Sequence, residues 1–370
     1  AASPVAFLLL VVVLAGIALG RRSVNWLPVA AVVLAGAIEV VLWRLFPGGG
    51  RYPFSLAEFA AGAAFCVLGV VFSWRVPMLR YLFAVYLVAL VSAYIIPSAV
   101  GENIARLRYA AIPLAVLVLS LRKWKPLVPC LTVLVLALSW NLTPLAQSYI
   151  HGSADTTAQQ SEWPSTIAFL RAHLGSDYRV EAVDTSAHWP AVYLADADIP
   201  LARGWFRQDD FPQNQLLYSK LGARAYDAWL RGLGVRYVVV TTAPPDYSAR
   251  AEAALVRSGR AGLVPVFSTA RISVYEVPHA RPIVTGPASP SAVSLTQARI
   301  GVSVHAGGLY RIAVRYSPYW RASDGCLSQG SDGMLRLQTR AARNVTIVFA
   351  VNASRALDQL AGERPSCTLR

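Results

Sequence analysis

"GENIARLRY", residues 101–109, decides the fold, because this short polar stretch separates two long apolar runs. The run before it is "YLFAVYLVALVSAYIIP" (81–97), and the run after it is "AAIPLAVLVLSL" (110–121). A chain that crosses a bilayer twice needs a polar connection of this kind between its spans, so the pattern predicts a turn at a membrane surface. The turn carries a glutamate, an asparagine and two arginines, and such charges need an explanation at the edge of a bilayer.

Apolar blocks recur through the first 150 residues. Hydrophobic residues make up 55% of the chain and charged residues 15%. The six blocks are Val5–Leu19, Trp26–Trp43, Leu56–Phe72, Tyr81–Ile96, Leu107–Leu121 and Leu127–Asn141. Several are shorter than the ~20 residues of a usual crossing, although interfacial aromatic residues and snorkelling arginines can extend them. A soluble helical bundle is the alternative, which such a succession of blocks disfavours because it leaves almost no polar face.

The distribution of Lys and Arg predicts the orientation of these spans. The first, third and fifth breaks between blocks hold basic residues and no acidic one: Arg21, Arg22, Arg75, Arg80, Arg122, Lys123 and Lys125. The positive-inside rule therefore places these breaks in the cytoplasm. We expect a multi-pass protein of the plasma membrane, with the even breaks and the long C-terminal region on the extracytoplasmic side.

The net charge of +14 does not indicate a nucleic-acid partner. Eleven of the 34 basic residues precede residue 151, where they set topology. The remaining 23 face 17 acidic residues, a modest excess for a surface of that size. We therefore expect membrane lipid as a partner and no nucleic acid.

The chain begins "AASPVAFLLL", without Met and without a basic segment before the apolar run. This beginning is unlike a signal peptide. We expect it to be an entry into a larger membrane protein with further spans before residue 1.

The four cysteines divide into two pairs. Cys66 and Cys130 lie inside apolar blocks and are expected to be small core residues. Cys326 and Cys367 lie in the C-terminal region, where an oxidising exterior permits a disulfide. Bonded and free states of this second pair both remain open.

Beyond residue 150 the patterns predict soluble domains. Helical patterns at 163–174, 225–234 and 246–259 alternate with strand patterns at 178–184 and 235–242, followed by a hairpin at 264–277. Asp246 and Gly259 are the expected N-cap and stop of the third helix. The Pro-rich stretch 278–291 is a predicted linker, and the strands after it suggest a β-sandwich.

The predicted fold class is an α-helical transmembrane bundle of about six spans, followed by an extracytoplasmic α/β domain and a C-terminal β-sandwich. The expected domains are residues 1–148, 149–280 and 281–370. No P-loop, dinucleotide-binding fingerprint, HExxH or CxxC occurs, and the five histidines show no metal-ligand spacing. We therefore expect neither a cofactor nor a metal site.

The first candidate site is the turn itself. The only acidic residues before residue 151 are Glu39, Glu58 and Glu102, and the orientation places all three at external ends of spans. Arginines bind phosphate in bidentate fashion, and a carboxylate can orient a hydroxyl group or act as a base. The predicted substrate-binding residues are Glu102, Asn103, Arg106 and Arg108. Alternatively, Glu39 pairs with Arg44, and the two arginines of the turn snorkel to lipid headgroups.

The second candidate site is "ARGWFRQDDFPQNQLLY", residues 202–218. Aromatic side chains beside amides and carboxylates are how proteins usually hold sugars, since rings cover the apolar sugar face and planar polar groups bind its hydroxyls. The candidate residues are Trp205, Arg207, Gln208, Asp209 and Asn214. A structural loop with Trp205 in the core of the α/β domain is the equal alternative.

Five stretches together resemble a family of actinobacterial multi-pass membrane proteins. They are "GENIARLRY", "RGWFRQDDFPQNQLLY", "YDAWLRGLGVRYVVV", "DYSARAEAALVRSG" and "RISVYEV", within about residues 95–320. The architecture of that family resembles the GT-C glycosyltransferases, and it is also similar to the YfhO-like and 6-pyruvoyl-tetrahydropterin-synthase-related membrane proteins. The resemblance implies a cell-envelope enzyme with a polyprenyl-phosphate sugar donor. The catalytic carboxylate of GT-C enzymes lies near the first span, which this chain is expected to lack, so no residue is assigned that role.

Three functions remain open. The first is the C-terminal portion of a GT-C-like glycosyltransferase, in which an acceptor hydroxyl displaces polyprenyl phosphate. The second is a non-catalytic, membrane-anchored envelope protein that binds glycan or a partner. The third is a transporter, which the position of the charges at span ends disfavours, because transporter sites lie near the bilayer midplane.

Overall fold

The computed structural model describes residues 4–21, 26–46, 50–153, 155–207 and 210–362. The chain forms two compact units. The helical unit comprises Ala1–Ile150 together with Phe206–Gln213, and the C-terminal unit comprises His151–Trp205 and Asn214–Arg370. The segment 206–213 therefore belongs to the helical unit, although it lies within the sequence of the other one.

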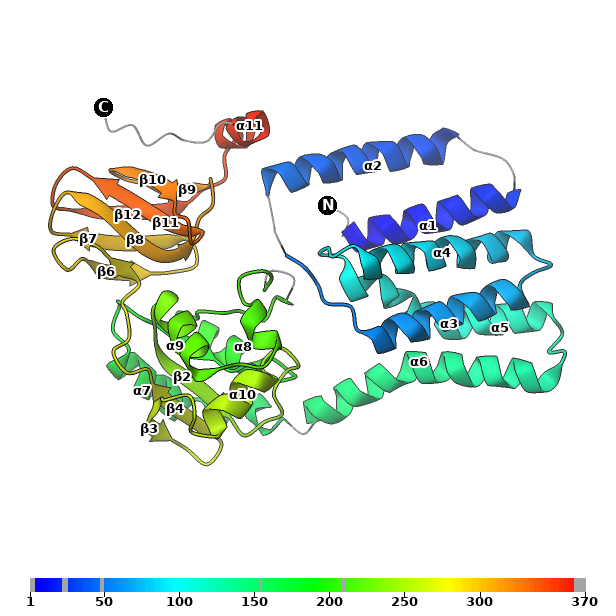
Figure 1. Ribbon diagram of the computed structural model, residues 1–370, viewed down its shortest axis with the longest axis horizontal. Helices are drawn as coiled ribbons and strands as arrows, with labels where there is room; N and C mark the ends of the chain where they lie inside the picture. Colours follow the sequence, from blue (N-terminus) through cyan, green and yellow to red (C-terminus); the bar gives the residue numbers. More distant parts are fainter. Residues whose placement is uncertain (1–3, 22–25, 47–49, 154, 208–209, 363–370) are drawn as a thin grey trace. The chain divides into compact units, whose positions relative to one another are not determined.

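Apolar helices build the helical unit (Figure 1). They are α1 (Pro4–Arg21), α2 (Trp26–Leu45), α3 (Leu56–Phe72), α4 (Pro77–Ile95), the 3₁₀ helix η1 (Gly101–Ala110), α5 (Ala111–Leu121) and α6 (Leu127–Ser153). Among the described residues, four segments are long and apolar enough to cross a membrane: Trp26–Leu45, Pro77–Ile95, Gly101–Leu121 and Leu127–Ile150. Ala6–Arg21 and Leu56–Phe72 are shorter apolar helices. Membrane-type helices are thus confirmed, and the count of six spans stays a prediction.

The largest difference from the predicted block boundaries lies at the end of α6. The last apolar block was expected to end at Asn141, but α6 continues through Pro144 to Ser153. A proline inside a helix removes one backbone hydrogen bond. The helix nevertheless persists beyond it with apolar side chains on its surface, including Leu145, Tyr149 and Ile150.

Aromatic and small residues fill the core of the helical unit. Phe65 of α3, Phe83 of α4 and Trp140 of α6 belong to one buried cluster, and the ring of Phe65 lies 5.2 Å from that of Trp140 between centroids. Cys66 and Cys130 are fully buried free thiols, which confirms their expected role as small core residues.

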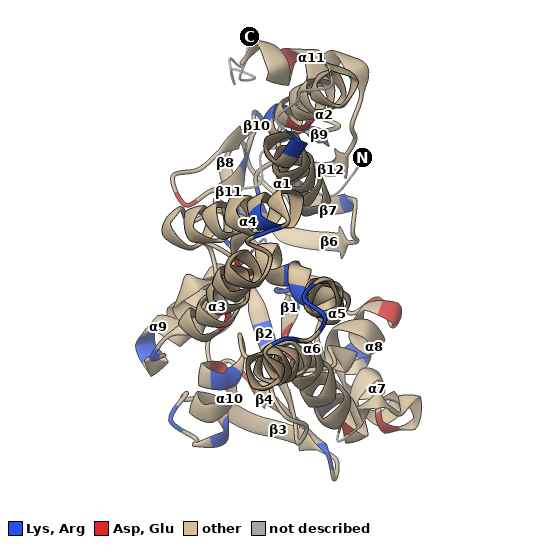
Figure 2. Cartoon of the chain, turned by 90° about the vertical axis from the view of Figure 1, so that its right-hand side faces the viewer, with Lys and Arg blue, Asp and Glu red and all other residues tan. Residues whose placement is uncertain are grey.

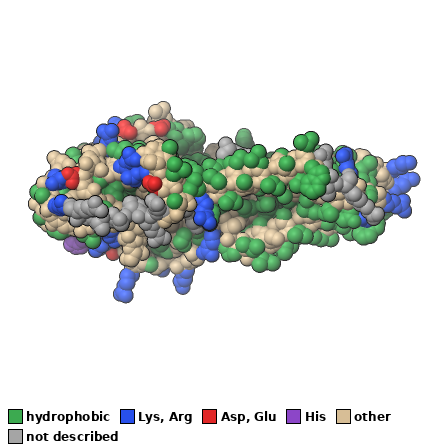
Figure 3. Space-filling view, turned by 90° about the horizontal axis from the view of Figure 1, so that it is seen from above, with side chains coloured by type: hydrophobic (Ala, Val, Ile, Leu, Met, Phe, Trp, Pro, Cys, Tyr) green, Lys and Arg blue, Asp and Glu red, His purple; other side chains and the backbone are tan. Residues whose placement is uncertain are grey.

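The C-terminal ends of α1, α3 and α5 lie at the same end of the helical unit (Figure 1). Figure 2 shows this end with its Lys and Arg residues, and Figure 3 shows hydrophobic side chains along the helices. The described basic residues here are Arg21, Arg75, Arg80, Arg122, Lys123 and Lys125. This arrangement is what a single cytoplasmic face of the bundle requires.

A four-stranded sheet forms the first part of the C-terminal unit. Its strands are β1 (Arg179–Ala182), β2 (Val235–Thr241), β3 (Val264–Ser268) and β4 (Ile272–Glu276), in the order β1-β2-β4-β3. β1 and β2 are parallel, and β3 and β4 form the predicted antiparallel hairpin. The helices are α7 (Pro164–His173), α8 (Trp189–Asp196), α9 (Ala223–Gly232) and α10 (Arg250–Arg257), and the 3₁₀ turns are η2 (Thr156–Ala158), η3 (Gln160–Glu162) and η5 (Gln215–Tyr218).

Both faces of this sheet are covered because side chains alternate along β2. Val238 and Val240 belong to a core shared with α9 and α10. Tyr237 and Val239 belong to the opposite core, shared with α7 and α8. A strand buried on both faces reads as a nearly continuous apolar run, as "VRYVVVTT" does.

Two further sheets form the second part of the C-terminal unit. Their strands are β5 (Val284–Thr285), β6 (Ser291–Leu295), β7 (Arg299–Val304), β8 (Gly308–Arg315), β9 (Trp320–Ala322), β10 (Cys326–Gln329), β11 (Met334–Thr339) and β12 (Arg343–Phe349), followed by α11 (Ala353–Ala361). The strand orders are β10-β11-β8-β5 and β6-β7-β12-β9. Side chains of both sheets share one core, including Ile312, Leu337 and Ile347. A β-rich C-terminal part is therefore confirmed.

Several local predictions were wrong or incomplete. Asp246 does not cap α10, which begins at Arg250; its carboxylate instead accepts hydrogen bonds from the backbone and side chain of Ser248. The predicted linker 278–291 contains β5, which pairs with β8. Cys326 is disulfide-bonded, and Cys367 lies outside the described residues.

Hydrogen bonds join the two parts of the C-terminal unit. The backbone carbonyl of Asp177 accepts from the Ile283 N–H at 2.8 Å, and its carboxylate accepts from the Ala292 N–H at 2.5 Å. The Arg311 guanidinium donates to the Gly232 carbonyl at 2.8 Å. Asp332 holds Arg311 in turn, accepting from its Nε at 2.7 Å.

Replacing Asp332 tests this connection. Burial acts to raise the pKa of Asp332, but hydrogen bonds from Arg311 and the Met334 N–H and the charges of Arg311 and Arg336 outweigh it and lower the pKa to about 2. Because the pKa is lower in the folded state, the Asp332 carboxylate stabilises the fold at pH values above its unfolded-state pKa of about 4. This stabilisation is lost as the pH falls through the folded-state pKa of about 2. Asp332→Asn should cost about 1 kcal/mol at pH 7, a value discounted for partial exposure.

Chemical unfolding of the C-terminal unit, measured by circular dichroism at pH 7 and at pH 2, checks this. The difference between wild type and Asp332→Asn should shrink at the lower pH, because about half of the Asp332 carboxyls are protonated at a pH equal to their pKa of about 2. Asp358→Asn, at an exposed position of α11, is the control and should have no effect at pH 7. Equal unfolding of wild type and Asp332→Asn at pH 7 would contradict the role of this carboxylate.

Candidate functional site: a polar rim on an apolar groove

The stretch 101–109 forms the 3₁₀ helix η1 between α4 and α5. Gly101 makes the turn into it with a φ of +40°, a conformation that residues with a Cβ rarely adopt. An added Cβ would also collide with the backbone oxygen of Tyr52. Glycine is therefore required here, because the chain before α3 passes directly against the start of η1.

Arg108 of η1 forms an ion pair with Glu58, which lies in the first turn of α3. Its Nη1 donates to Glu58 Oε1 at 3.0 Å, and both side chains are at least four-fifths buried. The indole N–H of Trp140, on α6, donates to the same oxygen at 2.9 Å. We call Glu58, Arg108 and Trp140 the polar rim; it joins elements that are far apart in sequence.

Neighbouring contacts fix η1 against the same helices. Asn141 of α6 donates to the Arg108 carbonyl at 2.5 Å, and the Tyr86 hydroxyl of α4 donates to the Ile104 carbonyl. The Ser55 side chain caps α3 by accepting from the Glu58 N–H. The polar rim is thus a built feature of the bundle rather than a set of mobile surface charges.

The other predicted residues of the turn have local partners. Arg106 is exposed and donates to Asn103 Oδ1 at 2.9 Å. Asn103 is buried. Glu102 accepts from the Ser55 N–H at 3.3 Å. The structure therefore brings all four predicted residues together in η1.

A groove of ≈ 170 Å³ lies between α3 and α6. Its lining is apolar except for Ser139 and the indole nitrogen of Trp140: Ala61, Ala64, Phe65, Leu68, Val133, Leu136, Ser139 and Trp140. Trp140 belongs both to this lining and to the polar rim. A narrow apolar channel with charged groups at one end is the shape of a site for an amphipathic molecule.

Glu58 is one of the three acidic residues before residue 151 but is not among the predicted substrate-binding residues. Its pairing with Arg108 could not be deduced, because fifty residues separate the two. Glu39 and Arg44, the alternative pair, form no ion pair within the part of the chain that the structure describes.

The second candidate stretch, 202–218, is divided between the two units. Trp205 and Asn214 belong to the C-terminal unit, where Asn214 accepts from the Trp229 indole at 3.1 Å. Arg207 belongs to the helical unit and pairs with Asp210 at 3.6 Å. Gln208 and Asp209 lie outside the described residues. Trp205 is 55% exposed, which contradicts its alternative placement in the core.

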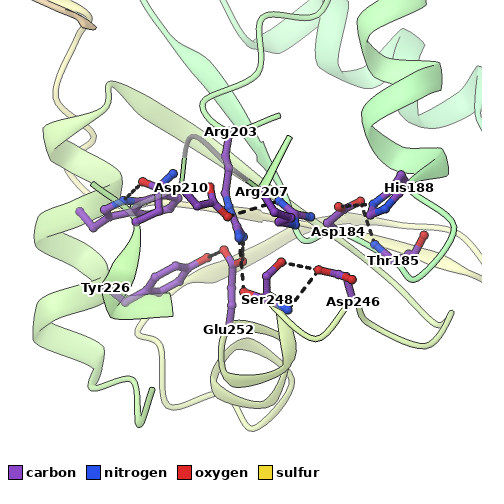
Figure 4. A network of polar contacts seen from close by, with 12 residues as sticks. Asp184, Thr185, His188, Arg203, Arg207, Asp210, Tyr226, Asp246, Ser248 and Glu252 are labelled. Atoms are coloured by element: carbon purple, nitrogen blue, oxygen red, sulfur yellow. Dashed lines mark hydrogen bonds and ion pairs between the residues drawn. The ribbon is translucent and has the colours of Figure 1, made fainter. Parts of the chain in front are cut away.

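A buried ionic group lies inside the C-terminal unit, shown in Figure 4. The Tyr226 hydroxyl donates to Glu252 at 2.6 Å, and Arg203 lies 3.9 Å from the other oxygen of that carboxylate. Burial, and after it the carboxylates of Glu252 and Glu181, raise the pKa of Tyr226 well above its usual value. The phenol therefore stays protonated and serves as a donor, which is a structural role for this group.

Comparisons of the chain with protein-family models, with curated proteins and with solved structures give no match. Within the described ranges, no group of three or more His, Cys, Asp or Glu residues is placed to hold a metal ion. The site must therefore be interpreted from its own geometry.

Removing the carboxylate of Glu58 from the polar rim should lower the free energy of unfolding. Glu58→Leu leaves the Arg108 charge buried without its partner, which typically costs about 3–5 kcal/mol. Glu58→Leu combined with Arg108→Leu should recover most of this loss, because no unpaired charge remains. Thermal unfolding of the detergent-solubilised chain measures both effects.

Glu39→Leu is the matched control, since Glu39 lies in α2 and has no ion pair among the described residues. It should leave the unfolding temperature unchanged or raise it. A single Glu58→Leu variant as stable as wild type would show that the pair is not structurally important.

Proposed function

We propose that this chain is the C-terminal portion of a GT-C-like membrane protein that handles a polyprenyl-phosphate sugar at the extracytoplasmic face. The observation that carries the proposal is the apolar groove between α3 and α6 with the polar rim at its end. In this proposal a short segment of an isoprenoid tail would occupy the groove of ≈ 170 Å³, and the phosphate would lie beside the arginines of η1.

The arginines differ in what they offer to a phosphate. Arg106 is exposed and bonded only to a neutral amide, so its charge is available to an anion. Arg108 is committed to Glu58 through one nitrogen, but its buried Nε has no hydrogen-bond partner among the described residues. A buried donor without an acceptor is costly, and a phosphate or a water molecule at the rim would satisfy it.

The proposed reaction is displacement at the anomeric carbon of the donor. The acceptor hydroxyl forms the new carbon–oxygen bond and gives its proton to a base, while polyprenyl phosphate leaves with the electrons of the broken bond. Arg106 would stabilise the negative charge on the departing phosphate. No residue of this chain is assigned as the base.

A non-catalytic, membrane-anchored envelope protein is the second candidate. The ion pair between Arg108 and Glu58 favours it, since a charge already paired within the protein needs no ligand. Both candidate functions involve binding of a lipid, but only the first includes transfer of a sugar to an acceptor. A sugar-transfer assay with the complete protein separates them after binding has been measured.

A bulky substitution in the groove tests whether lipid binds there, which both candidate functions assume. Ala61→Trp places an indole in the groove and should weaken binding of a 55-carbon polyprenyl phosphate at least tenfold. Arg106→Ala should weaken it about threefold to tenfold, corresponding to the loss of one partly exposed charge contact. Native mass spectrometry or microscale thermophoresis of the chain in nanodiscs measures the affinity.

Ala60→Trp, at an exposed position of the same helix, and Arg44→Ala, at an exposed position of α2, are the matched controls. Both should bind like wild type. Unchanged binding by Ala61→Trp would remove the groove from the proposal, and absence of binding by wild type would remove the proposed function.

A further inference from the structure

We propose that the C-terminal unit carries a separate sugar-binding site beyond the carboxyl end of β1. In this site Trp205 stacks on the apolar face of a neutral sugar ring, and His188 accepts a hydrogen bond from a sugar hydroxyl. The inference goes beyond the proposed lipid site, which lies in the helical unit, so either can fail without the other.

The position follows from the sheet. Asp184 is the second residue after β1, and the segment 244–246 comes after β2, the parallel neighbour of β1. Backbone hydrogen bonds tie these two ends together, from the Asp246 N–H to the Asp184 carbonyl at 3.0 Å and from the Ser186 N–H to the Pro244 carbonyl at 3.1 Å. The region beyond the carboxyl ends of parallel strands is where α/β proteins place their ligands.

Asp184 fixes the imidazole of His188. The His188 Nδ1 lies 2.6 Å from Asp184 Oδ2, and the other carboxylate oxygen accepts from the Thr185 N–H at 3.0 Å (Figure 4). Because a carboxylate only accepts, Nδ1 must carry the proton, which leaves the lone pair of Nε2 as an acceptor in the neutral ring. Nε2 has no hydrogen-bond partner among the described residues, and the His188 side chain is 32% exposed.

His188 occupies its position at a conformational cost. Its φ is 63°, in the left-handed region, immediately before α8 begins at Trp189. A non-glycine residue in this conformation is uncommon. The tight turn places the imidazole back over Asp184, four residues earlier.

Trp205 supplies the second part of the site. Its ring centroid lies 5.7 Å from that of His188, with 34° between the ring planes. The side chain is 55% exposed although it is large and apolar. A flat aromatic surface beside a hydrogen-bonding group suits the alternating CH and OH groups of a sugar.

The chemistry favours a neutral sugar over a phosphate. An imidazole in its neutral form presents a lone pair at Nε2, which repels the oxygens of an anion and attracts a hydroxyl proton. The nearby carboxylate of Asp184 is buried and already accepts two hydrogen bonds. A glycan of the cell envelope matches these requirements.

Saturation-transfer NMR of the full chain in nanodiscs tests the site. The probes are glucose, galactose, mannose, arabinose and their β-linked disaccharides. At least one should give saturation transfer to ring protons, and Trp205→Ala should weaken its binding at least tenfold. His188→Asn should do the same, since asparagine tolerates the left-handed backbone but is too short to place an acceptor where Nε2 lies.

Trp74→Ala is the matched control, because Trp74 is also exposed, at 63%, but lies in the helical unit. It should bind like wild type. Saturation transfer with no sugar of the panel, or equal binding by wild type, Trp205→Ala and His188→Asn, would overturn the inference. The lipid-binding measurements on Ala61→Trp are independent of either outcome.

Discussion

The ion pair between Arg108 and Glu58 is the interaction on which the helical unit depends. Charges near the hydrocarbon of a bilayer are costly, at about 2.5–3.5 kcal/mol for a single Arg or Asp at the centre of a span. Here each charge is offset by the other, and Trp140 adds a donor to the carboxylate. The pair also joins α3 to η1, and the indole joins both to α6. A polar turn between two spans thereby becomes a structural junction of the bundle.

The same junction shapes the groove beside it. Ala61 and Ala64 continue along α3 from Glu58, and their small side chains leave space against α6. Trp140 closes one end because its nitrogen is held by the rim. Packing and charge are therefore coupled at this point, and a ligand that displaced the Glu58 contact would also alter the end of the groove.

The sequence allowed elements with strong periodicity to be predicted and left their pairing undetermined. "VRYVVVTT" is a run of β-branched residues and forms β2, and "GENIARLRY" interrupts two apolar runs and forms the turn. The Pro-rich stretch 278–291 looked like a linker because its composition is that of a loop. Its Ile283 and Val284 are nevertheless buried, since a short strand gains its hydrogen bonds from β8, which no local pattern reveals.

In the candidate sites, too, the sequence predicts local clusters of residues but not the contacts between distant ones. The four residues of η1 could be chosen because they cluster in sequence, whereas Glu58 and Trp140 join them only through the fold. The polar neighbours of Trp205 in sequence make it a candidate, but the fold places its ring beside that of His188, seventeen positions earlier. An Asp and a His four residues apart after a predicted strand, "VDTSAH", was a usable signal for that pair.

The central claim is that the polar rim and the C-terminal unit work on the extracytoplasmic side of the membrane. Labelling of Ser219→Cys with a membrane-impermeant maleimide in intact cells tests it most directly, because Ser219 is exposed and lies in the C-terminal unit. Lys123→Cys, in the basic turn after α5, provides the opposite reference. The account predicts that Ser219→Cys reacts from outside and that Lys123→Cys reacts only after permeabilisation. The reverse pattern would invert the topology and contradict both proposed sites as extracytoplasmic ones.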